Sequence, residues 1–347
     1  MSNKVLLALS GGVDSSVCVH LLKQQGYDVS AVVFKMSSLH DTAVEDAKRV
    51  ADFLSIPLYV KDITAVFEQN VILPFCDYYR SGKTPNPCIF CNPTTKFKAL
   101  IDTANELGIE KIATGHYAKT ENIDGKTYLK KAGFIPRDQS YMLYRLPQDI
   151  LSRLVLPLNE LDKPSVREIA SKIGLFCANK PDSQEICFVE NNDYASFIEG
   201  RFGKSPEGDF IAPNGKVCGK HKGILHYTVG QRKHLGIALG TPVFIKEIDA
   251  TNNKIYLANS GEEYANAVTL TDCVYIPDKT AVLGKNLTAK IRSMAKPVPI
   301  SLEVLDETNA VVRFENAERA PAPGQSCVIY DGDFCLGGGY IDKQINK

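Results

Sequence analysis

The chain has 347 residues, of which 44% are hydrophobic and 23% charged, and its formal net charge is zero. This length predicts two or three globular domains, and neither a run of ~20 apolar residues for a membrane span nor a cleavable leader is evident. We therefore expect a cytoplasmic protein without a membrane partner, in which any binding of nucleic acid depends on local basic patches, because the overall charge offers no attraction to phosphate.

The first predicted elements are a strand and a helix that flank a glycine-rich turn. The apolar run 5–9 predicts a buried parallel strand, and apolar residues at helical spacing then predict a helix that stops at Gly26. Between them stands Ser10-Gly11-Gly12-Val13-Asp14-Ser15, which would present backbone N–H groups and a positive helix end to a phosphate. The turn lacks the lysine of a Walker motif. It resembles instead the loop of the N-type ATP pyrophosphatases, which cleave ATP to AMP and pyrophosphate.

Strands and helices continue to alternate along the chain. We expect strands at 29–34, 58–60 and 112–116, and helices at 41–54 with Asp41 as N-cap, at 64–80 and at 100–108. Pro85, Pro87 and Pro93 predict a stiff loop between the last two helices. The alternation predicts an α/β fold with a doubly wound parallel sheet, whose ligands lie at the carboxyl ends of the strands.

The second half of the chain has a different character. A turn signal at 122–126 predicts a hairpin, and a helix is expected from about Pro164. From residue 193 helical periodicity fades, and from 263 short alternating runs predict an antiparallel barrel. We therefore predict a catalytic domain at 1–192, a small mixed domain at 193–262 that binds tRNA, and a β-barrel at 263–347.

With these motifs in order, the chain resembles the tRNA-specific 2-thiouridylases of the MnmA type over nearly its whole length. The resemblance rests on residues 10–15, 84–87 with 91–92, 113–118, 138–141, 182–183 with 186–188, 227–233, and 322–325 with 330–339. It implies an adenine nucleotide α-hydrolase-like catalytic domain. It also implies transfer of AMP from ATP to O2 of the tRNA wobble uridine, followed by replacement of that oxygen with sulfur.

The expected nucleotide site combines the turn with residues that the resemblance adds. The turn would hold the phosphates, and Asp14 would orient it or assist Mg²⁺, which prefers oxygen ligands. The full predicted set is Ala8, Leu9, Ser10, Gly11, Gly12, Val13, Asp14, Ser15, Phe34 and Gly115.

Cysteine is expected to supply the sulfur chemistry. The chain has ten cysteines, which predict reduced thiols rather than a disulfide framework. By resemblance, Cys187 carries a persulfide received from a donor protein, and Cys91 attacks it, releasing sulfide or leaving a transient disulfide. The resemblance predicts a thiolate, and hence a lowered pKa, at one of them. Apolar surroundings predict Cys18, Cys177, Cys273 and Cys327 to be small buried residues, and Cys76, Cys218 and Cys335 have no predicted role.

One position departs from the family pattern. The residue after Asn86-Pro87 is usually an aspartate with a proton-transfer role, and here it is Cys88. The change creates Cys88-x-x-Cys91, which with Cys187 could ligate a 4Fe–4S cluster that leaves one iron open for hydrosulfide. Structural zinc completed by His116, and persulfide chemistry with Cys88 as an auxiliary thiol, are the alternatives. The sulfur would come from a cysteine desulfurase, a persulfide relay or free sulfide.

The expected partner is the anticodon stem-loop of tRNA. A flipped-out base needs a hydrogen-bonding edge and a stacking surface, which Gln139 and Tyr141 offer. The predicted contacts are Asn86, Pro87, Cys88, His116, Asp138, Gln139, Ser140, Arg292, Ser293 and Gln325. Residues 231–234 and 290–292 are basic segments suited to phosphates.

Two other functions remain open from the sequence. An ATP pyrophosphatase that amidates or ligates a small metabolite would explain the turn but not the cysteines. A non-catalytic tRNA-binding or metal-sensing protein would explain the basic segments but not the turn.

Overall fold

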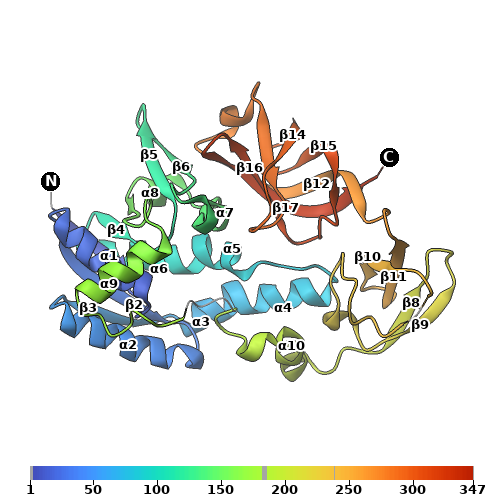
Figure 1. The fold of residues 1–347 in the computed structure, drawn as a ribbon, viewed down its shortest axis with the longest axis horizontal. Coiled ribbons are helices and arrows are strands. Elements are labelled where there is room, and N and C mark those ends of the chain that lie inside the picture. Colours follow the sequence, from blue (N-terminus) through green and yellow to red (C-terminus); the bar gives the residue numbers. More distant parts are fainter. Residues whose placement is uncertain (1–2, 182–185, 238, 347) are drawn as a thin grey trace.

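We describe residues 3–181, 186–237 and 239–346 of a computed structural model. An α/β body holds the N-terminus, a barrel drawn in orange and red holds the C-terminus, and a small sheet drawn in yellow lies beside the barrel (Figure 1). Helix α4 runs from the α/β body toward the small sheet (Figure 1).

The α/β body is built on a parallel sheet with the strand order β3-β2-β1-β4-β7 among the described residues. Its strands are β1 (Lys4–Ala8), β2 (Asp28–Lys35), β3 (Leu58–Asp62), β4 (Lys111–Ala113) and β7 (Leu154–Val155). Its main helices are α1 (Val13–Gln24), α2 (Asp41–Phe53), α6 (Phe97–Glu106) and α9 (Lys163–Lys172).

Helices cover both faces of this sheet. Leu6 of β1 belongs to a core cluster with Leu100 of α6, whereas Leu7 belongs to a second cluster with Val17 of α1 and Val166 of α9. Successive strand residues point to opposite faces, so two clusters on one strand require two covered faces. The predicted doubly wound parallel sheet is confirmed.

Two local predictions differ from the structure. The N-cap of α2 is His40 rather than Asp41, because the turn η1 (Ser38–His40) leads directly into the helix. The proline-rich segment, predicted as a stiff loop, is irregular up to Asn86 and helical from Pro87 onward. It forms α5 (Pro87–Cys91) and the π-helix η3 (Asn92–Lys96), which continue into α6. Pro87 is compatible with a first helical position, and the wider π turn accommodates Pro93, which lacks an N–H.

A helical arm extends from the sheet. It consists of α3 (Thr64–Phe67), the π-helix η2 (Glu68–Ile72), α4 (Leu73–Arg80) and α10 (Tyr194–Phe202). Its core cluster includes Phe75, Cys91 and Phe188. The arm therefore packs the segment around Cys187 against the helix that carries Cys91.

The remaining strands form two further sheets among the described residues. The small sheet has the order β10-β11-β8-β9, and the barrel sheet has the order β12-β15-β14-β13-β16-β17-β6-β5 with an added β12–β17 pairing that closes it. The small sheet contains β8 (Gly208–Ile211), β9 (Val217–His221), β10 (Val243–Asp249) and β11 (Lys254–Asn259). The barrel contains β12 (Tyr264–Tyr275), β13 (Leu287–Lys290), β14 (Val298–Val304), β15 (Ala310–Arg319), β16 (Ser326–Asp331) and β17 (Phe334–Ile345).

The predicted hairpin is present as β5 (Lys119–Ile123) and β6 (Lys126–Lys130), but it joins the barrel sheet through β6 and β17. The boundaries at 192 and 262 stay predictions. Short helices complete the described chain: η4 (Ile135–Arg137), α7 (Ser140–Leu143), α8 (Gln148–Leu151), η5 (Glu190–Asn192), η6 (Ile224–His226) and η7 (Lys279–Val282). None of the helices in the described ranges has the length and apolar character needed to cross a membrane.

Candidate functional site

The glycine-rich turn lies at the carboxyl end of β1, where α1 begins. Gly11 has a φ of +72°, and a Cβ placed on it would lie 2.5 Å from Asp46 Cβ and 2.8 Å from Ala47 N of α2. The turn can therefore lie against α2 only if this residue has no side chain. The Ser15 hydroxyl lies 3.1 Å from the Ser10 hydroxyl, and Ser16 Oγ donates to the Gly12 carbonyl at 2.8 Å.

Gly11→Ala is expected to destabilise the protein by about 2 kcal/mol or more and to weaken ATP binding, because the new Cβ pushes α2 away from the turn. Gly108→Ala is the matched control, since Gly108 has a φ of +64° and nothing within 4 Å of its added Cβ. Denaturant unfolding and calorimetric ATP binding measure both effects. Equal losses of stability in the two variants would contradict the argument.

The other predicted nucleotide residues gather around the turn. Leu9 N donates to the Val32 carbonyl at 2.8 Å, which holds the end of β1 beside β2, where Phe34 is buried. A Cβ on Gly115 would lie 3.0 Å from Ser15 N. The carboxyl ends of β1, β2 and β4 thus meet at one edge of the sheet, and the assignment of Ala8 to Ser15, Phe34 and Gly115 to ATP stays a prediction.

The turn has no lysine of its own, but a lysine from α9 lies beside it. Lys163 Nζ lies 2.8 Å from both carboxylate oxygens of Asp14, and the Lys163 side chain is only 8% exposed. The Tyr117 hydroxyl donates to Asp14 Oδ1 at 2.7 Å. Sequence reasoning missed Lys163, although its position at the start of a helix next to the N-cap Asp162 was visible. The structure therefore brings a buried positive charge to a turn that lacks one of its own.

The three candidate thiols lie on two segments. Cys88 and Cys91 are one helical turn apart on α5, with Cys88 exposed and Cys91 buried. Cys187 is exposed, but its neighbour Phe188 packs in the same cluster as Cys91. Cys187 interacts electrostatically with both Cys88 and Cys91, so all three thiols share one neighbourhood. Asp182 and Ser183 of the same motif lie outside the described residues.

The protein around these thiols disfavours their charged forms. Burial raises the pKa of Cys91 to about 11. Cys187 is open to solvent on one side but has packed protein on the other, and this desolvation raises its pKa to about 12, with the neighbouring thiols adding to both rises. The Lys96 charge acts in the opposite direction on the pKa of both thiols. The lowered thiol pKa that the sequence predicted is therefore not found in this arrangement for either residue.

Alkylation should report these raised pKa values. Below pH ~10 the thiolate fraction of Cys187 is expected to rise about tenfold per pH unit without a plateau, because a thiol ionises only as the pH approaches its pKa. Iodoacetamide labelling followed by peptide mass spectrometry, in a Cys88→Ser background, gives the rate at each pH. A plateau near neutral pH would contradict the prediction.

Lys96 of η3, the π-helix that follows Cys91, forms a hydrogen bond with His116. Lys96 Nζ lies 3.4 Å from His116 Nε2, and His116 Nδ1 lies 2.8 Å from the Thr114 hydroxyl. Burial and the Lys96 charge hold the pKa of His116 well below its ordinary value, so the ring is neutral at physiological pH. Both ring nitrogens are thus engaged, which leaves neither available to zinc or to tRNA without rearrangement.

The predicted metal site does not form among the described side chains. In the ranges given above, His, Cys, Asp and Glu side chains form no group of three or more that could hold a metal ion. Binding of a 4Fe–4S cluster by Cys88, Cys91 and Cys187 therefore stays a prediction, and the Asp14 carboxylate is engaged by Lys163 and Tyr117.

Most of the predicted tRNA contacts near the turn have partners inside the protein. Asp138 Oδ2 accepts from the Ser140 hydroxyl at 2.8 Å, and Ser140 is fully buried. Gln139 Oε1 accepts from the backbone N–H of Tyr117 at 2.9 Å. These bonds support the structure of the segment, and a role toward tRNA stays a prediction.

The barrel holds the segment that leads to the thiols. Gln325 Nε2 donates to the Thr84 carbonyl at 2.8 Å, and Thr84 N donates to the Pro323 carbonyl at 2.8 Å. Asn86 then caps α5 by accepting from Cys88 N at 3.2 Å, which places Pro87 inside the first turn. The predicted contacts Arg292 and Ser293 follow β13, where the exposed Arg292 donates to the Ala320 carbonyl at 2.8 Å.

The other cysteines are mostly buried. Cys18, Cys177, Cys273 and Cys327 are buried, which confirms their prediction as small core residues. Cys76 and Cys335 are buried as well, and Cys218 is half-buried in the small sheet.

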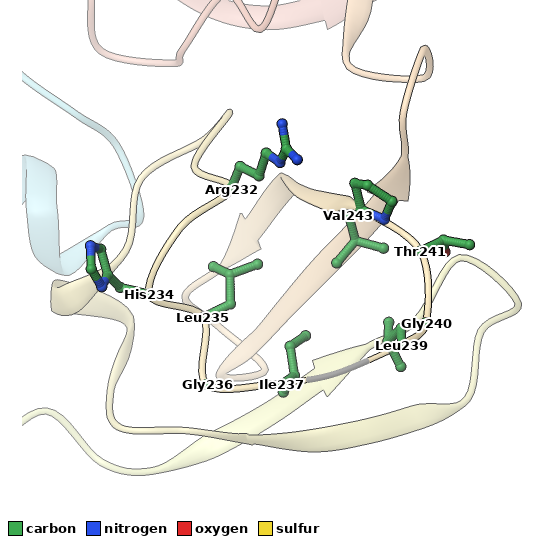
Figure 2. A pocket seen from close by; sticks show the side chains of 10 residues that line it. Arg232, His234, Leu235, Gly236, Ile237, Leu239, Gly240, Thr241 and Val243 are labelled. Carbon is green, nitrogen blue, oxygen red and sulfur yellow. The ribbon is translucent and has the colours of Figure 1, made fainter.

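Among the cavities of the described residues, two that lie outside the turn bear on the predicted sites. One of about 450 Å³ is lined by a single loop that runs from Arg232 and His234 round to Val243 at the start of β10 (Figure 2). It contains part of the basic segment predicted to bind phosphates and none of the nucleotide or thiol residues. A second cavity, of about 480 Å³, is lined by Ser37 and Leu39 after β2 and by Phe188. It therefore adjoins both the carboxyl edge of the sheet and the segment of Cys187.

An open parallel sheet with this turn at its carboxyl edge defines a nucleotide-binding α/β protein of the adenine nucleotide α-hydrolase class. Family models agree: "tRNA methyl transferase HUP domain" matches residues 3–191, "tRNA methyl transferase PRC-barrel domain" matches 195–259, and "Aminomethyltransferase beta-barrel domain" matches 266–341. The chain belongs to the family of tRNA-specific 2-thiouridylases of the MnmA type, whose members it matches along nearly its full length.

Two relatives illustrate the match. The "tRNA-specific 2-thiouridylase MnmA" of Clostridioides difficile is 44% identical over 359 aligned positions, covering 99% of each chain. That of Clostridium acetobutylicum is 42% identical and covers 98% of this chain and 100% of the relative. Among solved structures, the U34-tRNA thiolase NcsA from Methanococcus maripaludis with its [4Fe-4S] cluster aligns with a TM-score of 0.35 and 19% identity over 57% of this chain and 66% of that one. That likeness is too slight to bear on function.

Proposed function

We propose that this protein is an ATP-dependent tRNA sulfurtransferase that converts a uridine of tRNA to 2-thiouridine. The observation that carries the proposal is that a glycine-rich turn suited to phosphates and a pair of cysteines lie in the same α/β body. The glycine-rich turn, with a buried lysine beside it, lies at the carboxyl edge of the sheet. Cys91 packs in one core cluster with Phe188, the neighbour of Cys187. A cavity lined by Phe188 also reaches Ser37, just after β2. The family membership supplies the substrate class, because its named members act on tRNA and form thiouridine.

The first step activates the base. O2 of the uridine attacks the α-phosphorus of ATP, the α–β bridging bond breaks, and pyrophosphate leaves. Backbone N–H groups of the turn and the Lys163 charge would stabilise the negative charge that develops on the phosphates. The bound AMP then makes O2 a good leaving group. Mg²⁺ would accompany ATP as part of the substrate complex.

The second step delivers sulfur. A persulfide on a donor protein exchanges with the Cys187 thiol, which gives a Cys187 persulfide and a donor thiol. The Cys91 thiolate attacks Cys187 Sγ, so the Cys91–Cys187 disulfide forms and hydrosulfide leaves. Hydrosulfide adds to C2 of the activated uridine, and AMP departs with O2. A dithiol reductant then restores both cysteines.

The exposure of Cys187 and the burial of Cys91 support this order of events. A donor protein can reach only an exposed thiol, whereas a sulfur that is about to react must be kept away from water. We infer that the donor approaches Cys187 and that the target is the wobble uridine of the anticodon stem-loop.

The 4Fe–4S hypothesis stays a prediction drawn from the Cys88-x-x-Cys91 spacing. No step above depends on a cluster, because the described side chains are not arranged to hold one. Iron analysis of anaerobically prepared protein tests it directly. Absence of iron together with full activity of Cys88→Ser would exclude it.

Reconstitution tests the proposed function. The purified protein is incubated with unmodified tRNA, Mg-ATP and sulfide, and the nucleosides are measured by mass spectrometry alongside AMP. AMP that forms only with tRNA, together with an oxygen-to-sulfur exchange in uridine, would establish the function. Addition of a methyl group in the presence of a methyl donor, AMP formed only with a small metabolite, or no turnover at all would each overturn it.

A further inference from the structure

Between the nucleotide edge and the thiols lies a lysine that the two steps above do not use. Lys96 is the last residue of the π-helix η3, which begins immediately after Cys91. A π turn inserted in a helix changes the direction in which the following side chains point, and such turns are frequent at functional sites. The side chain of Lys96 is therefore presented differently from the way an unbroken α-helix would present it.

The surroundings of Lys96 hold it in this place. Its Nζ lies 3.4 Å from His116 Nε2, and the other ring nitrogen of His116 lies 2.8 Å from the Thr114 hydroxyl. An ammonium has only donors, so Lys96 donates to Nε2 and the neutral ring carries its proton on Nδ1, which donates to Thr114. The His116 ring also packs against Phe97, with the ring centres 5.7 Å apart.

The turn itself is anchored to neighbouring elements. Asn92 Nδ2 donates to the Met142 carbonyl of α7 at 2.7 Å, and the Thr94 hydroxyl donates to the Phe90 carbonyl at 2.6 Å. These bonds tie the first residues of η3 to α7 and to α5. The distance between Cys91 and Lys96 is therefore set by the fold rather than by a flexible loop.

Lys96 affects the ionisation of both thiols. The backbone N–H of Lys96 donates to the Cys91 sulfur, so η3 folds Lys96 back onto this thiol. The Lys96 charge also lowers the pKa of Cys91 and of Cys187, against the rise caused by burial. In the exchange between them a negative charge moves from Cys91 Sγ to the departing hydrosulfide. An ammonium held in this neighbourhood by His116 would stabilise that charge during the transfer.

We propose that Lys96, held by His116, is the cation that supports sulfur transfer between Cys187 and Cys91, and that His116 is a positioning residue rather than a contact for tRNA. This inference rests on the proposed function and assigns to Lys96 a role in the second step only. The first step, which adenylates the uridine and releases pyrophosphate, has its own cation in Lys163.

The test separates the two steps in Lys96→Met, Lys96→Arg and the matched control Lys98→Met. Lys98 is two residues further along and pairs with Asp102 at the surface, at 2.6 Å. With a persulfide donor, Lys96→Met is expected to lose about 100-fold or more of its thiolation rate, as is typical of removing one electrostatic stabiliser. The rate at which this variant adenylates tRNA, measured as pyrophosphate released in a single turnover, should stay within about threefold of the rate of the starting protein.

Two further measurements distinguish charge from structure. Lys96→Arg keeps the charge and should recover thiolation to within about tenfold of the starting protein. Excess free sulfide should rescue Lys96→Met, because sulfide adds to the activated uridine without the cysteine exchange. Thermal unfolding of each variant reports on folding. If Lys96→Met does not fold, Lys96→Gln carries the test, because it removes the charge but keeps an N–H donor for His116.

Several outcomes would overturn the inference. One is an equal loss of pyrophosphate release and of thiolation, which would assign Lys96 to the phosphates. The others are full thiolation by Lys96→Met or an equal loss in Lys98→Met. An unaltered protein that makes no thiouridine with either sulfur source would instead reject the proposed function.

Discussion

Replacing Cys187 by serine is expected to lower donor-dependent thiolation by at least about a thousandfold while leaving the tRNA-dependent release of pyrophosphate nearly unchanged. A hydroxyl has almost the shape of a thiol but cannot accept a sulfur from a persulfide. Cys187 is also the exposed member of the pair, so no buried cysteine can replace it as the point of entry. The two half-reactions are measured in one assay, by pyrophosphate release and by nucleoside mass spectrometry.

The controls use cysteines with other positions. Cys218→Ser alters a half-buried thiol in the small sheet and should leave both half-reactions intact. Cys88→Ser distinguishes the two sulfur chemistries, because persulfide transfer tolerates the loss of this thiol, whereas a 4Fe–4S cluster would lose a ligand. Donor-dependent thiolation that persists in Cys187→Ser would show that sulfur enters by another route.

Lys163→Met is expected to have the second large effect. The substitution leaves the Asp14 carboxylate without its cation, and breaking such a pair costs about 3 kcal/mol, near the lower end of the usual range because Asp14 is 31% exposed. The loss of positive charge beside the phosphates should also lower pyrophosphate release by about 100-fold or more. Denaturant unfolding and the pyrophosphate assay measure the two effects separately.

Two comparisons isolate the cause. Lys119→Met removes a lysine that pairs with Glu160 at the surface, with side-chain exposures of 42% and 61%, and should cost less than about 1 kcal/mol. The double variant Lys163→Met with Asp14→Asn removes both charges and should regain stability without regaining turnover. If Lys163→Met is no more destabilising than Lys119→Met, the ion pair between Lys163 and Asp14 does not stabilise the folded protein as argued.

The candidate site was only partly predictable. Residue type and spacing were enough to identify some positions from the sequence, namely Ser10 to Ser15, Cys91 and Cys187. Asp138 and Ser140 also attracted a functional prediction, but the structure shows them bonded to each other inside the protein. A polar cluster has the same appearance in a sequence whether its partners are internal or external.

Local patterns in the chain are enough to specify the alternation of strands and helices, the glycine-rich turn between β1 and α1, and the hairpin of β5 and β6. These features depend on neighbours a few residues apart, whose periodicity records which face is buried. Three pairings became visible only in the folded protein: Lys163 with Asp14, Lys96 with His116, and β6 with β17 of the barrel. Such pairings depend on how distant segments pack, and packing is set by the whole core rather than by any local pattern of residues.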